Sequence, residues 1–349
     1  MVNSFRAADR FGIQRVLAPL GVLPQQAERL DASLPMAEDE LWIEVESLNI
    51  DSASFHQIST ACGESLEKMA SHIFDLVRRR GKHHNPVTGS GGMLIGRVSA
   101  VGPAFPIQEK PVKVGDRIAT LVSLSLTPLE IRKIKKIYPK TDRVDIEGHA
   151  ILFASGLFAQ LPSDLPESLA LAVLDVAGAP AQTRRLVQEN QTVVVIGGGG
   201  KSGTLCLYEA KRKSGVKTIA LDYSDAGIAR LKALPFVDQV IQADARDAVE
   251  VMRKVSEATS GRMADLVINV ANLPETEMSS VLSCRQGGVV YFFSMATSFT
   301  RAALGAEGIG ADVDLRIGNG YTSGHAELAL ELIRESSTLR KLFTEVYCG

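Results

Sequence analysis

Hydrophobic and polar positions follow two different rhythms along this chain. In its first third, short apolar runs such as residues 41–45 and 92–101 are separated by turn residues. Apolar residues at helical spacing over residues 64–80 predict an amphipathic helix that ends near Gly81. A basic insertion at residues 132–143 is more typical of a solvated face than of a binding patch. The pattern predicts a compact, β-barrel-like first domain.

The rhythm changes in the middle of the chain, where apolar runs alternate with helix-like segments. The strand-like runs are residues 192–197, 217–222, 264–270, 288–294 and 313–318. The helix-like segments lie near residues 200–214, 225–234, 247–259 and 275–284. This βαβ alternation predicts a doubly wound parallel sheet with helices on both faces. One more helix, over residues 327–335, is expected to return to the first domain.

The two rhythms predict an α/β protein of two domains. We expect residues 1–172, completed by residues 321–349, to form a catalytic and substrate domain, and residues 173–320 to form a dinucleotide-binding domain. The length agrees, because 349 residues at roughly 150 per domain correspond to two domains.

Composition and charge narrow the classes of partner. Hydrophobic residues make up 45% of the chain and charged residues 22%, which argues against disorder and against a disulfide scaffold. The net charge of −2 predicts neither nucleic acid nor a membrane surface as a partner. No apolar run is long enough to span a bilayer or to act as a secretory signal, so we expect a soluble, cytoplasmic protein. The cysteines, Cys62, Cys206, Cys284 and Cys348, form no CxxC motif and are interpreted as reduced thiols.

The sharpest motif is a glycine-rich turn between a predicted strand and a predicted helix. Gly198, Gly200 and Gly203 fit GxGxxG, and Gly197 allows the looser GxxGxxG. In this context backbone N–H groups at the helix start face the pyrophosphate of a dinucleotide. The cofactor-binding residues predicted here are Gly197, Gly198, Gly200, Lys201, Ser202 and Gly203. A phosphate-binding P-loop is excluded, because its spacing needs glycine where Val195 stands.

Polar residues at the ends of further strands extend this site. Asp222 ends the next strand, where a carboxylate accepts hydrogen bonds from the adenosine ribose and repels a 2′-phosphate. NAD is therefore expected, and NADP is the less favoured cofactor. Tyr223, Asn269 and Ser294 follow or end strands at the same carboxyl edge and complete the predicted cofactor residues. Asp222 can also be a helix cap, and Asn269 and Ser294 can be turn residues.

Beyond these motifs, the chain resembles the medium-chain dehydrogenase/reductase superfamily, and within it the zinc-free enzymes that deaminate L-erythro-3,5-diaminohexanoate. Five segments carry the resemblance: residues 49–55 (NIDSASF), 85–93 (NPVTGSGGM), 122–128 (VSLSLTP), 175–182 (DVAGAPAQ) and 291–297 (YFFSMAT). The resemblance implies a GroES-like β-barrel catalytic domain and a Rossmann domain. It also implies NAD-dependent oxidative deamination to 5-amino-3-oxohexanoate and ammonia, a step of lysine fermentation, by a homo-oligomer, expected to be a dimer.

At the positions where zinc alcohol dehydrogenases of this superfamily hold their catalytic metal, this chain carries Asp51, Ser90 and Val176. A zinc site needs at least three N, S or O ligands, so no metal is expected. The scattered histidines, His83, His84, His149 and His325, are interpreted as surface or hydrogen-bonding residues.

Amine oxidation needs a base, because hydride leaves carbon only after the ammonium group has lost a proton. The resemblance makes Asp51 the first candidate for this base, with Glu147 second and Asp175 weaker. Ser90 is a candidate hydrogen-bond donor to the substrate, although it can also serve only its turn. The predicted catalytic residues are therefore Asp51, Ser90 and Glu147. Lys82, His84 and Arg97 are candidate partners for the substrate carboxylate.

Two other functions remain open from the sequence. One is a zinc-free quinone or enoyl reductase of the same superfamily, against which Asp222 argues mildly because such enzymes usually prefer NADPH. The other is a catalytically silent NAD-binding sensor. The acids near the lost zinc position favour catalysis.

Overall fold

The computed structural model describes residues 7–107 and 111–348. The chain divides after Ser163 into two compact units. The predicted boundary, at residue 172, lies further along the chain.

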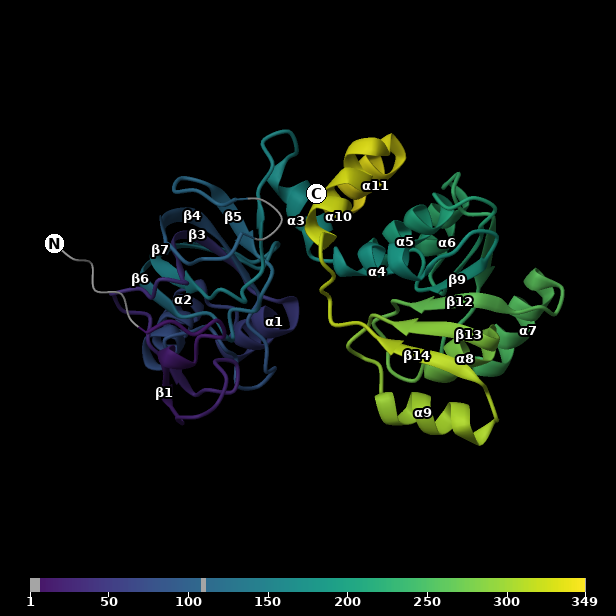
Figure 1. Ribbon diagram of the computed structural model, residues 1–349, viewed down its shortest axis with the longest axis horizontal. Helices are drawn as coiled ribbons and strands as arrows, with labels where there is room; N and C mark the ends of the chain where they lie inside the picture. The colour runs from purple at the N-terminus through teal and green to yellow at the C-terminus, as the bar shows by residue number, and fades with distance from the viewer. Residues whose placement is uncertain (1–6, 108–110, 349) are drawn as a thin grey trace. The chain divides into compact units, whose positions relative to one another are not determined.

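The first unit is built on a six-stranded antiparallel sheet in the order β6-β7-β3-β4-β5-β8. Its strands are β3 (Leu41–Asn49), β4 (Met93–Val101), β5 (Arg117–Thr120), β6 (Leu129–Tyr138), β7 (Arg143–Leu152) and β8 (Phe158–Gln160). Before them come η1 (Ile13–Arg15) and the two-stranded pair β1 (Val16–Ala18) and β2 (Arg29–Leu30). The helices are α1 (Ser52–Ala61) and α2 (Leu66–Arg80), labelled in Figure 1.

Strand β3 shows why these residues form a sheet with one buried face. Leu41, Ile43 and Val45 are buried in the core, whereas Trp42 and Glu44 alternate with them on the outer face. This two-residue period is that of a half-buried strand. The basic stretch 132–143 follows the same rule: it forms the end of β6, a turn and the start of β7. It is therefore part of the sheet rather than an insertion, and its charges lie on the solvated face.

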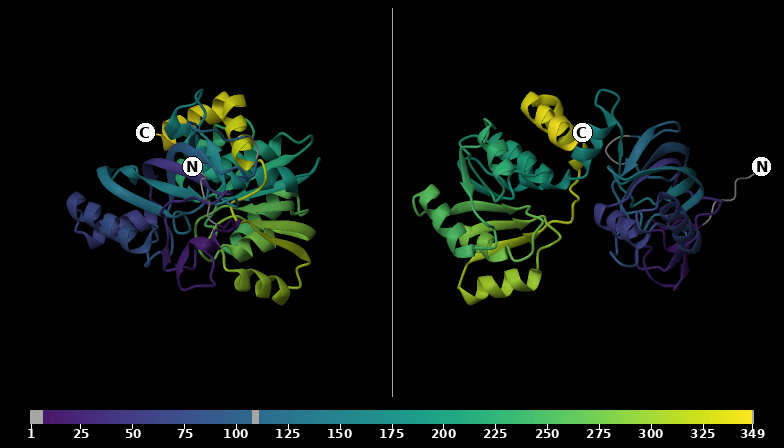
Figure 2. Two further views of the ribbon diagram at one scale, coloured as in Figure 1. Left: turned by 60° about the vertical axis from the view of Figure 1, so that its left-hand side comes forward. Right: turned by 180° about the vertical axis from the view of Figure 1, so that it is seen from behind.

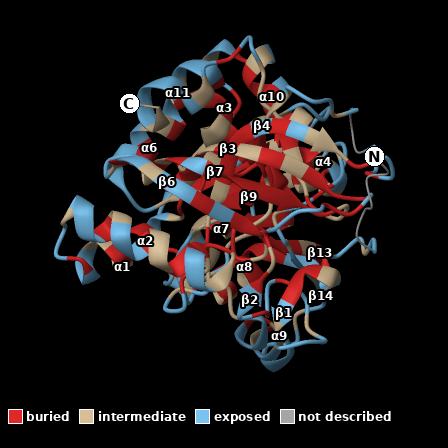
Figure 3. Ribbon diagram, turned by 90° about the vertical axis from the view of Figure 1, so that its left-hand side faces the viewer, coloured by how far each residue is buried: buried red, intermediate tan, exposed pale blue. Residues whose placement is uncertain are grey.

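The helix predicted over residues 64–80 is confirmed as α2. Ser65 caps its start, because its hydroxyl accepts a hydrogen bond from the Lys68 N–H, and Gly81 ends it with a φ of 63°. Its charged outer face is pale blue in Figure 3. Helix α1 was missed, since its apolar positions are few; Asp51 caps it.

The second unit contains a six-stranded parallel sheet in the order β11-β10-β9-β12-β13-β14. Its strands are β9 (Thr192–Ile196), β10 (Lys217–Asp222), β11 (Gln239–Gln242), β12 (Ala264–Asn269), β13 (Cys284–Phe292) and β14 (Val313–Ile317). Its helices are α3 (Glu167–Leu174), α4 (Gly178–Leu186), α5 (Lys201–Lys211), α6 (Asp225–Lys232), α7 (Ala248–Thr259), α8 (Glu277–Ser283), α9 (Phe299–Gly308), α10 (His325–Glu335) and α11 (Ser337–Tyr347).

This sheet confirms the predicted doubly wound arrangement. All five predicted strands are present, and the short β11 was missed, as were α3, α4, α9 and α11. Helices α4, α5 and α10 pack on one another, and α8 packs on both α7 and α9. Figure 1 shows α5 and α9 on opposite faces of the sheet. Strands β9, β10 and β12 in the middle of the sheet are almost completely buried, as expected of a parallel sheet covered on both sides.

The C-terminal helices explain the difference in the domain boundary. Helix α10 packs on α3 and α4, and α11 packs on α3 and α5, so contacts group residues 164–172 and 321–348 with the second unit. Figure 2 shows the two yellow C-terminal helices beside the teal helices of this unit. That these segments complete the substrate domain stays a prediction. No helix among the described residues is long and apolar enough to cross a membrane.

Candidate functional site

The glycine-rich loop of the second unit has the shape that a dinucleotide needs. It runs from the end of β9 into α5, with Gly200 as the helix cap. Gly197 has a φ of 82°, and a Cβ there would lie 2.8 Å from the Ala271 nitrogen. A Cβ at Gly203 would lie 2.5 Å from the Gly197 oxygen, so only glycine lets α5 pack this closely on the loop. The residues present therefore fit a pyrophosphate at the start of α5.

Asp222 lies at the end of β10 and holds this loop. Its Oδ2 accepts a hydrogen bond from the Gly199 N–H at 3.0 Å, and its Oδ1 accepts from the Ser224 N–H and hydroxyl, both at 3.0 Å. A carboxylate offers about four acceptor positions, so one remains free for a ribose hydroxyl. Asp222 is thus both a loop residue and a candidate ribose partner.

The other predicted cofactor residues differ in how far the protein already uses them. Lys201 begins α5 and its Nζ pairs with Asp175 Oδ2 at 2.6 Å. Ser202 follows it and is half-buried, and Tyr223 is 68% exposed. Asp175, the weaker candidate base, is exposed and already paired in this way.

Asn269 and Ser294 end or follow the neighbouring strands β12 and β13. Asn269 is buried, and its amide donates to Thr276 Oγ1 at 2.9 Å and to Ser280 Oγ at 2.8 Å. Ser294 is half-buried and its hydroxyl accepts from the Ala296 N–H at 3.1 Å. The order of the strands along the chain reverses between β9 and β12. Ligands of such sheets bind at the carboxyl ends of the strands near this reversal, and Asn269 and Ser294 both lie at that edge. Asn269 shapes this edge, and Ser294 is the more accessible of the two.

In the first unit, Asp51 uses one carboxylate oxygen and leaves the other. It caps α1, with Oδ1 accepting the Ser54 N–H at 2.9 Å. Its Oδ2 is buried, and no residue in the described part of the chain donates a hydrogen bond to it. Asp51 is therefore a helix cap that keeps one carboxylate oxygen without a hydrogen-bond partner among the described residues.

A chain of hydrogen bonds, which includes the backbone N–H groups of Ser54 and Ser90, connects the Asp51 carboxylate to the backbone of Ser90. The hydroxyls of Ser54 and Thr88 share a hydrogen bond, and Thr88 Oγ1 accepts the Ser90 N–H at 3.4 Å. Ser90 is half-buried and its carbonyl accepts the Asn85 N–H at 2.9 Å, which closes the turn. The structure thus brings two of the three predicted catalytic residues into one network.

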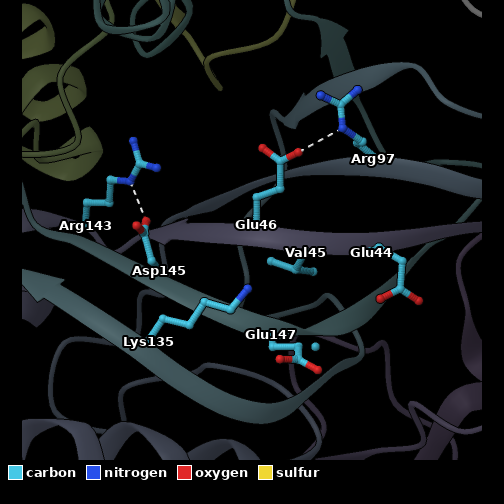
Figure 4. A pocket seen from close by; sticks show the side chains of 9 residues that line it. Glu44, Val45, Glu46, Arg97, Lys135, Arg143, Asp145 and Glu147 are labelled. Carbon is cyan, nitrogen blue, oxygen red and sulfur yellow. Dashed lines mark hydrogen bonds and ion pairs between the residues drawn. The ribbon is translucent and has the colours of Figure 1, made fainter.

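Glu147 lies elsewhere. It points outward from β7, is about half exposed, and lies 3.8 Å from the Arg132 guanidinium. Figure 4 shows it in a polar groove on the outer face of the sheet, with Lys135, Asp145 paired to Arg143, and Glu46 paired to Arg97. The alternation of β7 places its side chain on the solvated face, opposite the core. The geometry therefore favours Asp51 over Glu147 as the base.

Two of the three candidate partners for a substrate carboxylate are already engaged. Lys82 is fully buried and donates to the Pro24 and Gln25 carbonyls at 2.7 and 3.1 Å, and burial lowers its pKa to about 8. Arg97 pairs with Glu46 at 3.1 Å on the outer face. His84 is half-buried, and its Nδ1 has no hydrogen-bond partner among the described residues. His84 remains the accessible candidate.

His83 was missed as a site residue, because a sequence does not reveal burial. It has no exposed surface, its Nδ1 lies 3.1 Å from the Gly91 carbonyl oxygen, and burial lowers its pKa to about 4. All four cysteines are free, and burial raises the pKa of Cys206 and of Cys284 to about 12. Within residues 7–107 and 111–348, no three His, Cys, Asp or Glu side chains gather as metal ligands do.

Comparison with known proteins adds to this geometry. A family model described as the L-erythro-3,5-diaminohexanoate dehydrogenase N-terminal domain matches residues 14–162. The chain is 51% identical to the L-erythro-3,5-diaminohexanoate dehydrogenase of Acetoanaerobium sticklandii, over 97% of this chain and 98% of that protein. It is 49% identical to the enzyme of the same name from Fusobacterium nucleatum, with the same coverage of both chains.

Solved structures give the fold. An alcohol dehydrogenase from Thermotoga maritima shares 15% identity with this chain, covers 89% of it and 86% of its own length, and superposes with a TM-score of 0.53. This likeness, together with the two sheets described above, confirms the predicted fold class: a GroES-like barrel domain and a Rossmann domain.

Proposed function

The chain belongs to the L-erythro-3,5-diaminohexanoate dehydrogenase family, and we propose that it oxidises the C3 amine of L-erythro-3,5-diaminohexanoate with NAD. The products are 5-amino-3-oxohexanoate, ammonia and NADH. The observation that carries this proposal is the similarity to two dehydrogenases of that name over nearly the whole chain.

The reaction sets clear demands on the protein. The C3 ammonium must lose a proton, so that the nitrogen lone pair can assist departure of hydride from C3. Bound at the glycine-rich loop, the nicotinamide cofactor supplies the hydride acceptor. Water must then replace nitrogen at C3. The chain therefore needs a base, a hydride-acceptor site and a place for water.

Asp51 supplies the base in this proposal. Its Oδ2 is a buried acceptor that no described side chain or backbone group occupies, while its Oδ1 is fixed by the cap of α1. A carboxylate also attracts the cationic substrate, whereas a zinc ion would repel it. Ser90, in the same hydrogen-bond network, is proposed to donate to the substrate.

NAD is the proposed cofactor because of Asp222. Its carboxylate lies against the glycine-rich loop through the Gly199 N–H and faces the position of the adenosine ribose in this fold. A 2′-phosphate beside it would meet a negative charge. The exposed Tyr223 is proposed to lie along the adenine.

The test is an initial-rate assay of NADH formation from L-erythro-3,5-diaminohexanoate, with NADP and a metal chelator as parallel arms. We expect NADH formation that the chelator does not change, with kcat/KM for NADP at least about tenfold lower, corresponding to about 1.4 kcal/mol. In the Asp222→Ser variant this difference should narrow, because the repelling charge is gone.

Other outcomes assign other functions. Reduction of quinones or enoyl substrates without diamine oxidation would identify a zinc-free reductase. Binding of NAD without turnover of either substrate class would identify a sensor. Inactivation by the chelator would identify a metal that the proposal lacks.

A further inference from the structure

Asp51 and His83 lie on either side of one turn of the first unit. A Cβ at Gly91 would lie 2.5 Å from the His83 carbonyl oxygen, and a Cβ at Gly92 would lie 2.8 Å from the Asp51 nitrogen. Two consecutive glycines thus pack directly on the backbones of these two residues. The backbones of Asp51 and His83 therefore lie close together, although they are far apart in the sequence, and the Asp51 charge acts on the His83 imidazole.

Each of the two side chains presents a buried acceptor. The Gly91 carbonyl can only accept, so His83 Nδ1 carries the hydrogen between them and Nε2 carries a lone pair. Neither His83 Nε2 nor Asp51 Oδ2 has a hydrogen-bond partner anywhere in residues 7–107 and 111–348. Leaving a buried polar atom unsatisfied costs about 1–3 kcal/mol, so a pair of them calls for a donor.

Burial keeps His83 neutral at neutral pH by lowering the pKa of its imidazole to about 4. The hydrogen bond to Gly91 and the charge of Asp51 oppose this shift, and His72 and His84 reinforce it. Asp51 is the acid whose charge acts on His83. The only hydrogen on the neutral ring is used by the Gly91 carbonyl, so His83 Nε2 and Asp51 Oδ2 are both acceptors.

We propose that Asp51 Oδ2 and His83 Nε2 together bind the water that hydrolyses the substrate iminium. A water molecule has two hydrogens, one for each of the two acceptors, and buried waters typically bind to polar atoms that are otherwise unsatisfied. Donating both hydrogens leaves the oxygen lone pairs free to attack carbon. This inference rests on the proposed function, since oxidation of an alcohol would need no such water.

Hydrolysis begins after hydride has left C3 and after the first proton has passed from Asp51 to solvent. The water oxygen then bonds to the iminium carbon, and the C=N electron pair moves to nitrogen. One water proton goes to Asp51, which then protonates the nitrogen. The C–N bond breaks, ammonia leaves, and the remaining hydroxyl proton goes to Asp51. Iminium and water thus become ketone, ammonia and one proton.

Two substitutions distinguish the roles of the two ring nitrogens of His83. In His83→Asn the amide can still donate to the Gly91 carbonyl, as Nδ1 does, but nothing replaces Nε2. In His83→Gln an amide oxygen can take the place of Nε2. His56→Asn, on the exposed face of α1, is the matched control.

Stopped-flow measurement of NADH distinguishes hydride transfer from hydrolysis. For His83→Asn we expect the first turnover to stay within about threefold of the wild type, while steady-state turnover falls about 100-fold. The trace then shows a burst of NADH. Hydroxylamine, which attacks the iminium in place of water, should restore turnover, and His83→Gln should keep most of it. Equal losses in both phases, or no effect of hydroxylamine, overturn the inference.

A crystal structure of the wild-type protein with NAD gives a readout that needs no activity. A water within hydrogen-bond distance of both Asp51 Oδ2 and His83 Nε2 supports the site, and a direct bond between these atoms, or no water, overturns it. Failure of the wild type to form NADH from the diamine would instead overturn the proposed function, and it would leave this structural result standing.

Discussion

At the scale of single residues, Asp51 divides its two carboxylate oxygens between structure and chemistry. Oδ1 caps α1 through the Ser54 N–H, and Oδ2 is a buried acceptor. Because the cap fixes the carboxylate, the second oxygen is held in place without a further partner. Such preorganisation reduces the loss of freedom on reaching the transition state.

The Asp51→Asn variant tests this division. Asparagine caps helices about as well as aspartate, so we expect the thermal midpoint to change little. An amide cannot accept the ammonium proton, so kcat should fall about 10²- to 10⁴-fold. Initial rates and thermal unfolding measure the two effects, with Asp145→Asn on the outer face of β7 as the control. A kcat within about threefold of the wild type would place the base elsewhere.

At the scale of elements, the last helix of the chain supports the glycine-rich loop. Tyr347, at the end of α11, donates from its hydroxyl to the Gly199 carbonyl at 3.3 Å. Gly199 also donates to Asp222, so one residue of the loop joins α11 and β10. Burial raises the pKa of the Tyr347 hydroxyl, which keeps it a donor. The helix thus fixes the loop without belonging to the sheet.

Removal of this hydroxyl should weaken cofactor binding. Tyr347→Phe keeps the ring that packs on Phe343 at 5.1 Å between centroids, and it deletes one hydrogen bond worth about 0.5–1.5 kcal/mol. We expect the Kd for the bound cofactor to rise about two- to tenfold, with little change in kcat. Fluorescence titration with NADH measures the Kd of the reduced cofactor. An unchanged Kd would show that the loop keeps its shape without α11.

At the scale of the whole molecule, buried histidines link stability to pH. Burial lowers the pKa of His83, His84 and His325, that of His83 from 6.5 to about 4. The unfolded chain therefore binds more protons than the folded one between about pH 6.5 and pH 4. Stability is present above this range and is lost as the pH falls through it.

Urea unfolding at a series of pH values measures this linkage. His83 alone should contribute up to about 3 kcal/mol to the loss on acidification. The His83→Asn variant should show a shallower dependence, whereas His56→Asn should follow the wild type. A wild-type free energy of unfolding that stays constant from pH 7 to pH 4.5 would contradict the burial of these imidazoles.

The sequence by itself determined the parallel sheet and its glycine-rich loop. The strands β9, β10 and β12 and the second half of β13 are apolar runs, because both faces of the sheet are covered there, and such runs are visible in any single sequence. The loop was visible too, since glycines at fixed spacing are needed wherever a helix packs closely on a turn. The short β11 and the helices α1, α3, α4, α9 and α11 were not predicted, and in α1 the apolar positions are few. The resemblance of five segments, rather than any spacing, indicated the reaction.

Only the tertiary structure decided which polar side chains are paired, buried or free. Glu147 and Asp51 are both acids beside the same sheet, yet strand alternation turns one to solvent, and a helix cap leaves the other with a buried acceptor. Lys82 is engaged by two carbonyls from a segment more than fifty residues away. Gly91 and Gly92 let one turn pack on the backbones of both His83 and Asp51. Burial and hydrogen bonding arise from contacts distant in sequence, and a linear pattern does not record them.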